Sequence, residues 1–420
     1  MRSGVVTTLP CMGPGRRGKH AVAAQAHVHA HGAAPAASRH TRRLVTAVLI
    51  PLAALTVLAL ILLWPAPAAK NVVAPGSTSA RVPAEVISVS EKPCPAVDPG
   101  TPAQGRPRRC GQAVVRLTGS AQRGTAVAIA LPQDRGLAVH VGDRIELDAV
   151  TDAATGRFTY SYRDFQRSHP MMWLIALTLA VVLAFGRGHG LAALGGLVLS
   201  FAVLLYFVIP AILDGRSPLL IAVVGSAAIM LGALYLTHGV NVHTSVAVAG
   251  TLVSLVITGV LGALFTTAMH LSGIASDDTA YLSTTRDTID MRGLLLAGIV
   301  IGALGVLDDV TVTQAVTVAE LAAARPRSRR ELYRSAIRIG RAHVGSAVNT
   351  IVLAYAGTSL PLLLLVAVSP QPLTEMLTSE FLAQEILRSA VGTAGLVASV
   401  PITTVLAAMV AGLGATEPRH

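Results

Sequence analysis

The chain has 420 residues, of which 52% are hydrophobic and 13% charged, and its formal net charge is +11 at pH 7. Soluble globular chains carry about 25% charged residues, so this chain lacks the charged surface that they need. Several apolar runs reach the roughly 18 residues that span a bilayer. Composition therefore excludes a disordered chain, a fibrous chain and an ordinary cytosolic enzyme. It predicts an all-α polytopic membrane protein whose basic residues mark topology, with the lipid bilayer and not nucleic acid as partner.

Residues 1–43 are expected to form a disordered cytoplasmic tail. They hold seven basic residues and no acidic residue, and they show no apolar period. The apolar run 44–64 follows. The tripeptide Ala66-Pro67-Ala68 behind it resembles a signal-peptide cleavage site, but the apolar region of a signal peptide is about 7–15 residues long. The longer run favours an uncleaved first transmembrane helix.

Residues 65–168 differ from the rest of the chain. Short runs of alternating polarity are separated by Pro, Gly and Asp turns, which is typical of strands. The segment predicts a small extracytoplasmic β domain, a partly closed barrel of about five strands. The expected strands are 81–89, 113–119, 125–131, 143–150 and 157–162.

The membrane domain is expected at 169–414, with a short cytoplasmic tail at 415–420. Apolar runs predict seven further spans, which makes about eight transmembrane helices in all. The seven are expected at 171–186, 191–213, 218–238, 244–271, 293–315, 342–368 and 388–414.

Loop charges predict the orientation of these spans. Residues 322–341 carry seven arginines and one glutamate, and residues 272–291 carry four aspartates and one arginine. Residues 369–387 carry three glutamates and no basic residue. The positive-inside rule then places the arginine-rich loop in the cytoplasm and the two acidic loops outside. The chain is thus expected in the plasma (inner) membrane, with both termini cytoplasmic and the β domain outside.

Two cysteines flank a Pro/Gly-rich loop in the expected external domain. Because that compartment is oxidising, Cys94 and Cys110 are predicted to form a disulfide; two free thiols are the alternative. In the chain-entropy model such a loop contributes roughly 3 kcal/mol. Cys11 lies in the cytoplasmic tail and is expected to stay reduced.

An acidic pair interrupts the sixth expected span. Residues 293–307 are apolar and cover about 22 Å at 1.5 Å per residue, so Asp308 and Asp309 fall inside a hydrocarbon core about 30 Å thick. Two adjacent ionised carboxylates are not tolerated there without partners. Either a cation neutralises them or at least one is protonated.

Polar residues around this pair predict a site. Thr311, Thr313 and Gln314 widen the polar arc of the sixth span, and on the seventh span a second arc of about 120° is polar. The two stripes are predicted to face each other across a wet cavity that binds a proton or cation. The alternative is a structural network that locks two helices together. The proposed site residues are Asp308, Asp309, Thr311, Thr313, Gln314, His343 and Asn349, with Ser346 and Thr350 on the same arc as the last two.

Other small and polar residues favour structural roles. Thr251, Ser254 and Thr258 share one face of the fifth span, and such hydroxyl groups more often satisfy the backbone than bind a substrate. Gly302 and Gly305 permit close helix approach, or a broken helix of the kind found in transporters.

Known catalytic and cofactor motifs are missing from the sequence. It has neither a His-Glu-x-x-His zinc motif nor a Walker Gly-x-x-x-x-Gly-Lys-Ser/Thr motif. Histidines 27, 29 and 31 in the tail lack the cysteine or carboxylate that would complete a closed metal site. No enzyme activity, metal site or cofactor is therefore predicted.

Four runs resemble the YibE/F-like family of bacterial membrane proteins, and so does the DFQR sequence at 164–167. The family resemblance covers roughly residues 80–414, with a mild departure at 316–318, where members often have small hydroxyl residues. It implies a multi-pass plasma-membrane protein of unestablished function, often guessed to be a permease, and it supplies no catalytic residues. It supports Asp308, Asp309, Thr311, Thr313 and Gln314 as motif positions. The runs are GALGVLDDVTVTQAVTVAEL (302–321), THGVNVHTSVAVAGTLVSL (237–255), GRAHVGSAVNTIVLAYAGTSLPLLLL (340–365) and EILRSAVGTAGLVASVPITT (385–404).

The sequence therefore predicts a secondary transporter or permease of an unknown small solute or ion, with the path between the sixth and seventh spans. The alternative is a non-transporting scaffold or sensor whose external β domain binds envelope partners. Flux that stops in Asp308→Asn or Asp309→Asn would favour the transporter. Loss of function on deleting residues 75–165 would favour the scaffold.

Overall fold

The computed structural model describes residues 39–66, 80–93, 109–119, 122–131, 139–151, 158–324 and 328–412. Cys11, Cys94, the tail histidines up to His31 and the tail 415–420 lie outside these residues. The predicted disulfide, the C-terminal tail and residues 1–38 of the N-terminal tail therefore stay predictions. Residues 39–43, which were expected to be disordered, lie in a helix.

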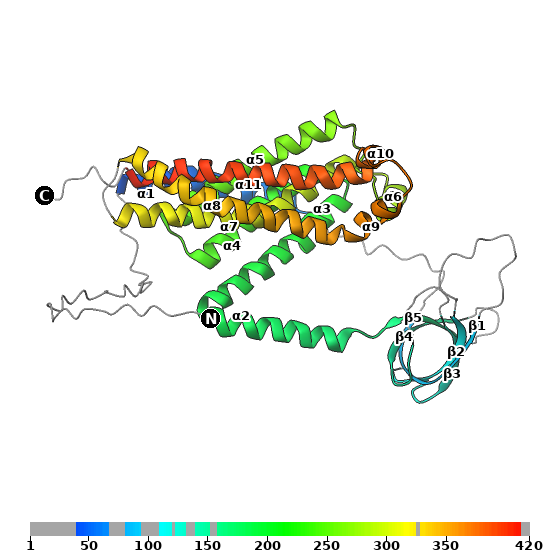
Figure 1. Cartoon of the computed structure of the whole chain (residues 1–420). Coiled ribbons are helices and arrows are strands. Elements are labelled where there is room, and N and C mark those ends of the chain that lie inside the picture. Colours follow the sequence, from blue (N-terminus) through cyan, green and yellow to red (C-terminus); the bar gives the residue numbers. More distant parts are fainter. Residues whose placement is uncertain are drawn as a thin grey trace, which may run out of the picture.

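The first folded part is a five-stranded antiparallel sheet with strand order β3-β2-β1-β4-β5. It curls until β3 and β5 touch, which gives a half-closed barrel (Figure 1). The prediction of five strands is confirmed. The strands are β1 (Ala80–Pro93), β2 (Arg109–Leu117), β3 (Ala126–Ala130), β4 (Arg144–Thr151) and β5 (Phe158–Phe165).

The inner face of the curled sheet forms a dry apolar core. Ile145, Leu147 and Ala149 alternate along β4 and are at most 2% exposed, whereas the residues between them are less buried. Val82 and Val115 meet them from β1 and β2. This is the period of two that predicts strands from sequence.

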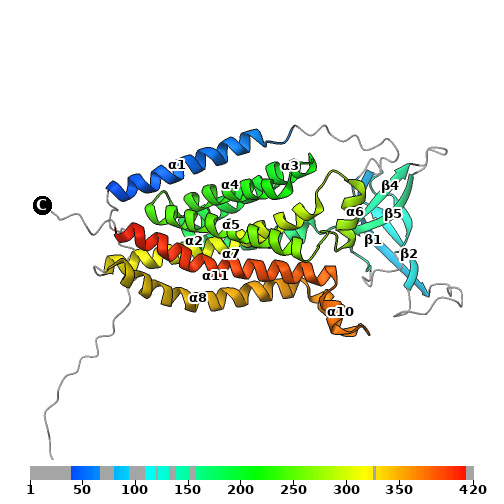
Figure 2. The same cartoon turned by 90° about the horizontal axis from the view of Figure 1, so that it is seen from above.

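The second part is a bundle of helices (Figures 1 and 2). Among the described residues, six helices are long and apolar enough to cross a membrane, or up to seven if the bent pair of α8 and α9 is one span. The helices are α1 (Arg39–Leu62), α2 (Ser168–Val203), η1 (Leu204–Val208), α3 (Ile209–Leu213), α4 (Pro218–His238), α5 (Val242–Ala268), α6 (Asp277–Thr285), α7 (Met291–Ala324), α8 (Arg329–Thr358), α9 (Leu360–Val368), α10 (Leu373–Leu377) and α11 (Glu380–Gly412).

The expected count of eight spans differs from this finding at α2. Two expected spans, 171–186 and 191–213, lie in one helical segment, Ser168–Leu213. Its backbone leaves helical geometry at Arg187 (φ 47°, ψ −126°), and Figure 1 shows the segment bent into a V. At Gly190 a Cβ atom would stand 2.5 Å from the carbonyl oxygen of Val182. A sharp backbone bend thus replaces the expected loop, and only glycine fits beside it.

The expected span 342–368 is also bent. α8 and α9 meet at an angle of 66°, and Ser359 lies between them. Pro361 at the start of α9 favours a break there, because proline lacks a backbone donor and its ring clashes with the preceding turn of a helix. The predicted possibility of a break at Gly302 and Gly305 is not seen, because α7 is continuous through both.

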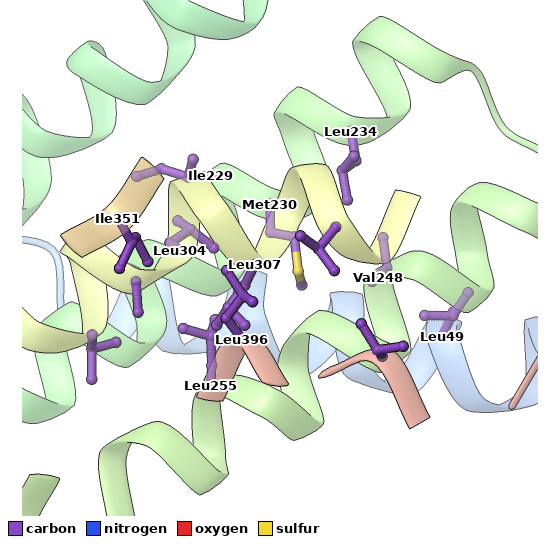
Figure 3. Close-up of a cluster of buried hydrophobic side chains, with 14 residues drawn as sticks. Leu49, Ile229, Met230, Leu234, Val248, Leu255, Leu304, Leu307, Ile351 and Leu396 are labelled. Carbon is purple, nitrogen blue, oxygen red and sulfur yellow. The ribbon is translucent and has the colours of Figure 1, made fainter. Parts of the chain in front are cut away.

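Three helices form the centre of the bundle. α5, α7 and α11 all pack against one another, with α4 and α8 beside them and α1 against α4 and α5. Figure 3 shows their apolar core, in which Leu255, Leu307 and Leu396 come from α5, α7 and α11. Leu49 of α1 belongs to the same core, so the first helix packs as part of the bundle.

The two ends of the bundle differ in what they carry. The start of α1, the end of α11 and the start of α8 lie at one end, whereas the sheet, α6 and α10 lie at the other (Figure 2). At the sheet end, the Glu380 carboxylate accepts hydrogen bonds from the Ser272 and Gly273 amides, at 2.6 and 3.1 Å. This fixes the α5–α6 connection to the start of α11.

Candidate functional site

The acidic pair lies near the midpoint of the longest straight helix at the centre of the bundle. α7 runs from Met291 to Ala324, so Asp308 and Asp309 lie about 26 and 27 Å from its start at 1.5 Å per residue. Leu304 and Leu307, just before them, are buried in the core of Figure 3. The acids therefore follow a well-packed apolar stretch of α7, near the middle of a helix long enough to span the membrane.

The two neighbouring acids occupy different environments. Asp308 is half-buried, and its Oδ1 atom is buried without a hydrogen-bond partner. Asp309 is exposed, because successive helical side chains point about 100° apart. Within the described residues neither carboxylate forms an ion pair. The predicted site shared by both carboxylates is therefore divided between an inner and an outer position.

Thr311 and Gln314 are buried at the centre of the bundle, and both form hydrogen bonds to other helices. The Thr311 hydroxyl lies 2.6 Å from that of Thr251 on α5 and 3.1 Å from the Asp308 carbonyl oxygen, and its single proton is donated to one of them at a time. Gln314 Nε2 donates to the Ala336 carbonyl oxygen at 3.1 Å and to Thr404 Oγ1 at 2.7 Å. These bonds tie α7 to α5, α8 and α11.

The polar stripe on α5 has the structural role that the sequence favours. The hydroxyl groups of Thr251, Ser254 and Thr258 each donate to the carbonyl oxygen four residues earlier. Glycines let the neighbouring helix come close: a Cβ atom on Gly250 would overlap Thr403 of α11, and one on Gly395 would overlap Thr258. Hydroxyl groups and glycines thus form a buried polar seam between α5 and α11.

No hydrogen bond between described residues joins the polar stripe of α8 to that of α7. His343, Ser346, Asn349 and Thr350 are all exposed. α8 instead turns Gly340 towards Gln314. Thr313 is half-buried on α7, and the wet cavity between the two stripes stays a prediction. A helical wheel shows which residues share a face, but the direction of that face depends on where the neighbouring helices pack.

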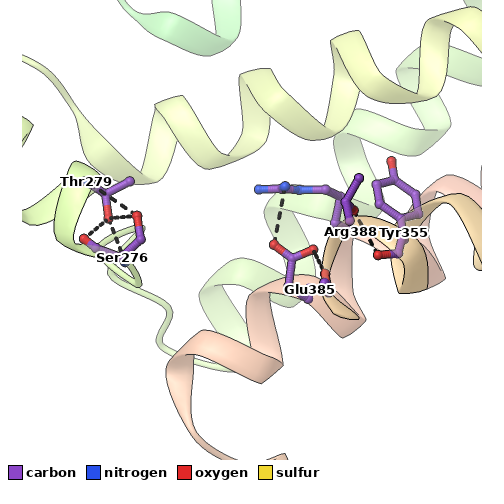
Figure 4. Close-up of polar contacts among 7 residues, drawn as sticks. Ser276, Thr279, Tyr355, Glu385 and Arg388 are labelled. Carbon is purple, nitrogen blue, oxygen red and sulfur yellow. Dashed lines mark hydrogen bonds and ion pairs between the residues drawn. The ribbon is translucent and has the colours of Figure 1, made fainter. Parts of the chain in front are cut away.

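A charged cluster at the sheet end of the bundle was missed by sequence reasoning (Figure 4). Arg388 Nη1 lies 3.4 Å from Glu385 Oε1, and Ser359 at the α8–α9 bend contacts Glu385 at 3.5 Å. Arg388 Nε is buried without a partner. The Tyr355 hydroxyl is 3.2 Å from where a Cβ of Gly302 would stand, next to this cluster. The sequence signal for this cluster was Arg388, a single arginine at the predicted start of the last span.

Chemically, the arrangement offers one buried carboxylate oxygen without a hydrogen-bond partner at membrane depth, that of Asp308. Among the described residues no group of three or more His, Cys, Asp or Glu side chains is placed to hold a metal ion. Asp308 can accept a proton or contact a cation through its buried oxygen. The Thr311 hydroxyl and the Gln314 amide on the same helix are occupied by bonds to other helices.

Fold and site together define a polytopic α-helical membrane protein. The sequence model of the family described as YibE/F-like protein matches residues 174–412, which is more than half of the chain. The chain belongs to this family, as the motif at 302–321 predicts. The match covers the helices from α2 to α11 and leaves the wider resemblance, from residue 80, a prediction. None of the curated proteins and none of the solved structures compared with the chain matches it.

Proposed function

We propose that the protein is a secondary transporter, or permease, of the plasma membrane in which Asp308 binds the coupling proton or cation. One observation carries the proposal: Asp308 has a buried carboxylate oxygen without a partner near the midpoint of α7. Burying an ionised group without a partner costs several kcal/mol. Acids retained within membrane spans mark ion and proton pathways.

The alternative role for Asp308, as a structural link between helices, has less support. Thr311 and Gln314 already join α7 to its neighbours through hydrogen bonds. Among the described residues of α7, Asp308 Oδ1 is the buried side-chain atom that has no hydrogen-bond partner. A link between helices would need a bond to another helix, which Asp308 lacks. A group that binds and releases an ion needs an unoccupied position of this kind.

The orientation is part of the same proposal. The arginines at the start of α8 lie at the end of the bundle opposite the sheet, and basic residues favour the cytoplasmic side. We place both termini inside and the sheet outside. In intact cells, an impermeant thiol reagent should then label Tyr281→Cys on α6 but not Ser328→Cys before α8. Labelling of Ser328→Cys alone would reverse the orientation.

The proposed ion site is tested by comparing two variants that differ by one position. Purified wild type, Asp308→Asn and Asp309→Asn are unfolded thermally across a pH series, and with Na⁺, K⁺, Mg²⁺ or Zn²⁺. A cation that binds the native state at 100 times its Kd stabilises it by about 2.7 kcal/mol. We expect the response to pH or cation to vanish in Asp308→Asn and to persist in Asp309→Asn.

Several results would contradict this assignment. Equal responses in all three proteins would remove Asp308 from the site. Loss of the response in Asp309→Asn alone would move the site to the outer position. If a ligand is found, its flux into proteoliposomes should stop in Asp308→Asn while the variant remains folded.

A membrane scaffold or sensor is the second candidate, and the sheet is the observation that favours it. The sheet has its own apolar core and is joined to α2 by only two residues, Gln166 and Arg167. A folded external module suits the recognition of envelope partners. Deletion of residues 75–165 separates the two candidates. It should abolish partner binding for a scaffold, and leave the Asp308-dependent response to pH or cation unchanged for a transporter.

A further inference from the structure

A polar face on α7 and α8 has no partner in the single chain. We call it the outer polar face; it consists of Asp309 on α7 and His343, Ser346, Asn349 and Thr350 on α8. All five residues are exposed. None of the hydrogen bonds between described residues joins Asp309 to the α8 members, and Thr350 donates within its own helix, to the Ser346 carbonyl oxygen.

Asp309 lies at membrane depth. It is about 27 Å from the start of α7 and about 22 Å from its end at 1.5 Å per residue. The hydrocarbon core is about 30 Å thick, so a helix centred on the membrane carries Asp309 near the midplane. Lipid tails offer no hydrogen bonds, and charged groups at this depth face protein or water.

The α8 donors lie at the same depth as Asp309. Two contacts between α7 and α8 set the level: Tyr355 against Gly302, and Ala336 with Gly340 against Gln314. Because the helices run in opposite directions, interpolation between these contacts places Asp309 level with residues of about 341–348 on α8. This stretch contains His343 and Ser346.

The α7 surface beside Asp309 lacks large side chains. Gly298, Gly302 and Gly305 are exposed and follow helical spacing towards Asp309. A Cβ atom on Gly298 or Gly305 would meet nothing within 4 Å in the single chain. Small residues at membrane depth let a second helix approach closely. One side of the chain thus combines a hydrogen-bond acceptor, donors at the same depth and a surface without large side chains.

We infer that a second copy of this chain covers the outer polar face. A two-fold axis along the membrane normal keeps every residue at its own depth. It therefore brings Asp309 of one copy level with His343 and Ser346 of the other, and the same contact forms twice in such an interface. Because the acceptor and the donors share one depth, the face is complementary to itself.

The inference holds for a transporter and for a scaffold, so it does not depend on the proposed function. If the protein transports, each copy completes the α7–α8 wall of the other at the level of the acidic pair. The outer residues of the sequence-predicted site, Asp309, His343 and Asn349, then serve the contact between copies. Asp308 remains the ion site within each copy.

Cysteine crosslinking in native membranes tests the interface. In a background where Cys11, Cys94 and Cys110 are replaced by Ser, Ser346→Cys and Gly345→Cys are treated with a short bifunctional thiol crosslinker. Val253→Cys on α5 is the matched control, because it is 44% exposed and, from the Thr251–Thr311 contact, lies at nearly the same depth. We expect a covalent dimer from Ser346→Cys or Gly345→Cys and none from Val253→Cys.

Other outcomes overturn the inference. A crosslinked product of a different mass would identify an unlike subunit. Labelling of Ser346→Cys by a charged, impermeant thiol reagent without dimer formation would show a water-filled path. If neither crosslinking nor labelling occurs, the face lies against lipid.

A second measurement does not rely on crosslinking. Dimer dissociation is followed by fluorescence transfer between labelled copies in vesicles as lipid is added. Asp309→Leu removes an acceptor twice per dimer and should weaken the dimer roughly tenfold. Asp309→Asn keeps an acceptor and should weaken it less. Wild-type protein that is monomeric at every lipid ratio would refute the inference.

Discussion

The core of the sheet and the centre of the bundle both contain fully buried side chains, but they are built from different residues. The sheet core is apolar throughout, with Ile145 and Leu147 at 0% exposure. In the bundle, Thr251 and Thr403 of the polar seam between α5 and α11, and Thr311 of α7 beside it, are also 0% exposed. Thus hydroxyl groups and glycines occupy positions in the bundle that aliphatic side chains fill in the sheet.

The solvent explains this difference. A domain in water gains about 25 cal/mol for each Å² of apolar surface that it buries. Helices in lipid gain nothing of this kind, because lipid tails are as apolar as leucine, so close packing and hydrogen bonds hold them together. Gly250 and Gly395 permit the close packing, and the hydroxyl groups around them form the hydrogen bonds. The comparison can be tested by the same substitution in the two regions.

Leu147→Ala in the sheet and Leu307→Ala in the bundle give the largest expected difference. Both leucines are 0% exposed. In the sheet the variant loses both the transfer free energy and the packing of its side chain, so the free energy of unfolding should fall by about 3 kcal/mol. In the bundle mainly the packing is lost, and the fall should be about half as large.

Hydrogen exchange in nanodiscs measures each region in the full-length protein, through amides of β4 and of α7. Val150→Ala, where the valine is 39% exposed, is the control in the sheet and should change little. A larger loss of unfolding free energy for Leu307→Ala than for Leu147→Ala would contradict this explanation. It would show that the change from water to lipid does not account for the difference between the two cores.

Gly395→Ala tests close approach in the seam. A Cβ atom there would overlap Thr258, so the two helices must separate. Overpacking of this kind costs typically 1–3 kcal/mol, and we expect about 2. Gly392→Ala one turn earlier is matched, because its Cβ would meet nothing within 4 Å, and it should stabilise α11 by about 0.5 kcal/mol. Unfolding in mixed micelles by SDS should separate the two variants; equal stability would refute the close-packing argument.

The sheet was the part most predictable from sequence. Alternation of polarity with a period of two identifies strands locally, and turn residues separate them. The predicted strands at 113–119, 125–131 and 143–150 overlap β2, β3 and β4. Strand β1 continues beyond the predicted residue 89 because β2 still pairs with it at Pro93. The extent of pairing is a property of two strands together, so one run of residues does not predict it.

The site was predictable only in part, for a similar reason. The sequence shows that Asp308, Thr311 and Gln314 are polar residues within an apolar run. It does not show that Asp308 points inward and Asp309 outward, because this depends on where α5 and α11 pack around α7. For the same reason, the sequence alone does not show whether His343 and Asn349 face α7, and that part of the site stays a prediction. Glycine-rich runs such as 186–190 likewise allow a loop or a sharp bend, and only packing decides between them.

Gln314→Leu tests the hydrogen bonds of the seam. Its Nε2 group bonds to the Ala336 carbonyl oxygen and to Thr404. Hydrogen bonds between membrane helices contribute about 0.6 kcal/mol each on average, so removing two of them should cost about 1 kcal/mol. Thr404→Val removes one of the two partners, and a double-mutant cycle isolates that bond. Additive effects of the two variants would mean that the Gln314–Thr404 bond contributes nothing to stability.

Thr251→Val should give the smallest effect. The Thr251 hydroxyl both donates to the Ala247 carbonyl oxygen and lies 2.6 Å from Thr311. Valine preserves the shape of the side chain and removes one bond between helices, so we expect a loss of about 0.6 kcal/mol. Thr311→Val should cost about the same, because it removes the same bond from the other side. The double variant should then lose little more than either single one, since a bond can be lost only once. A loss above about 2 kcal/mol in either single variant would exceed what one such bond contributes, and would show that the hydroxyl pair supports more than the contact between α5 and α7.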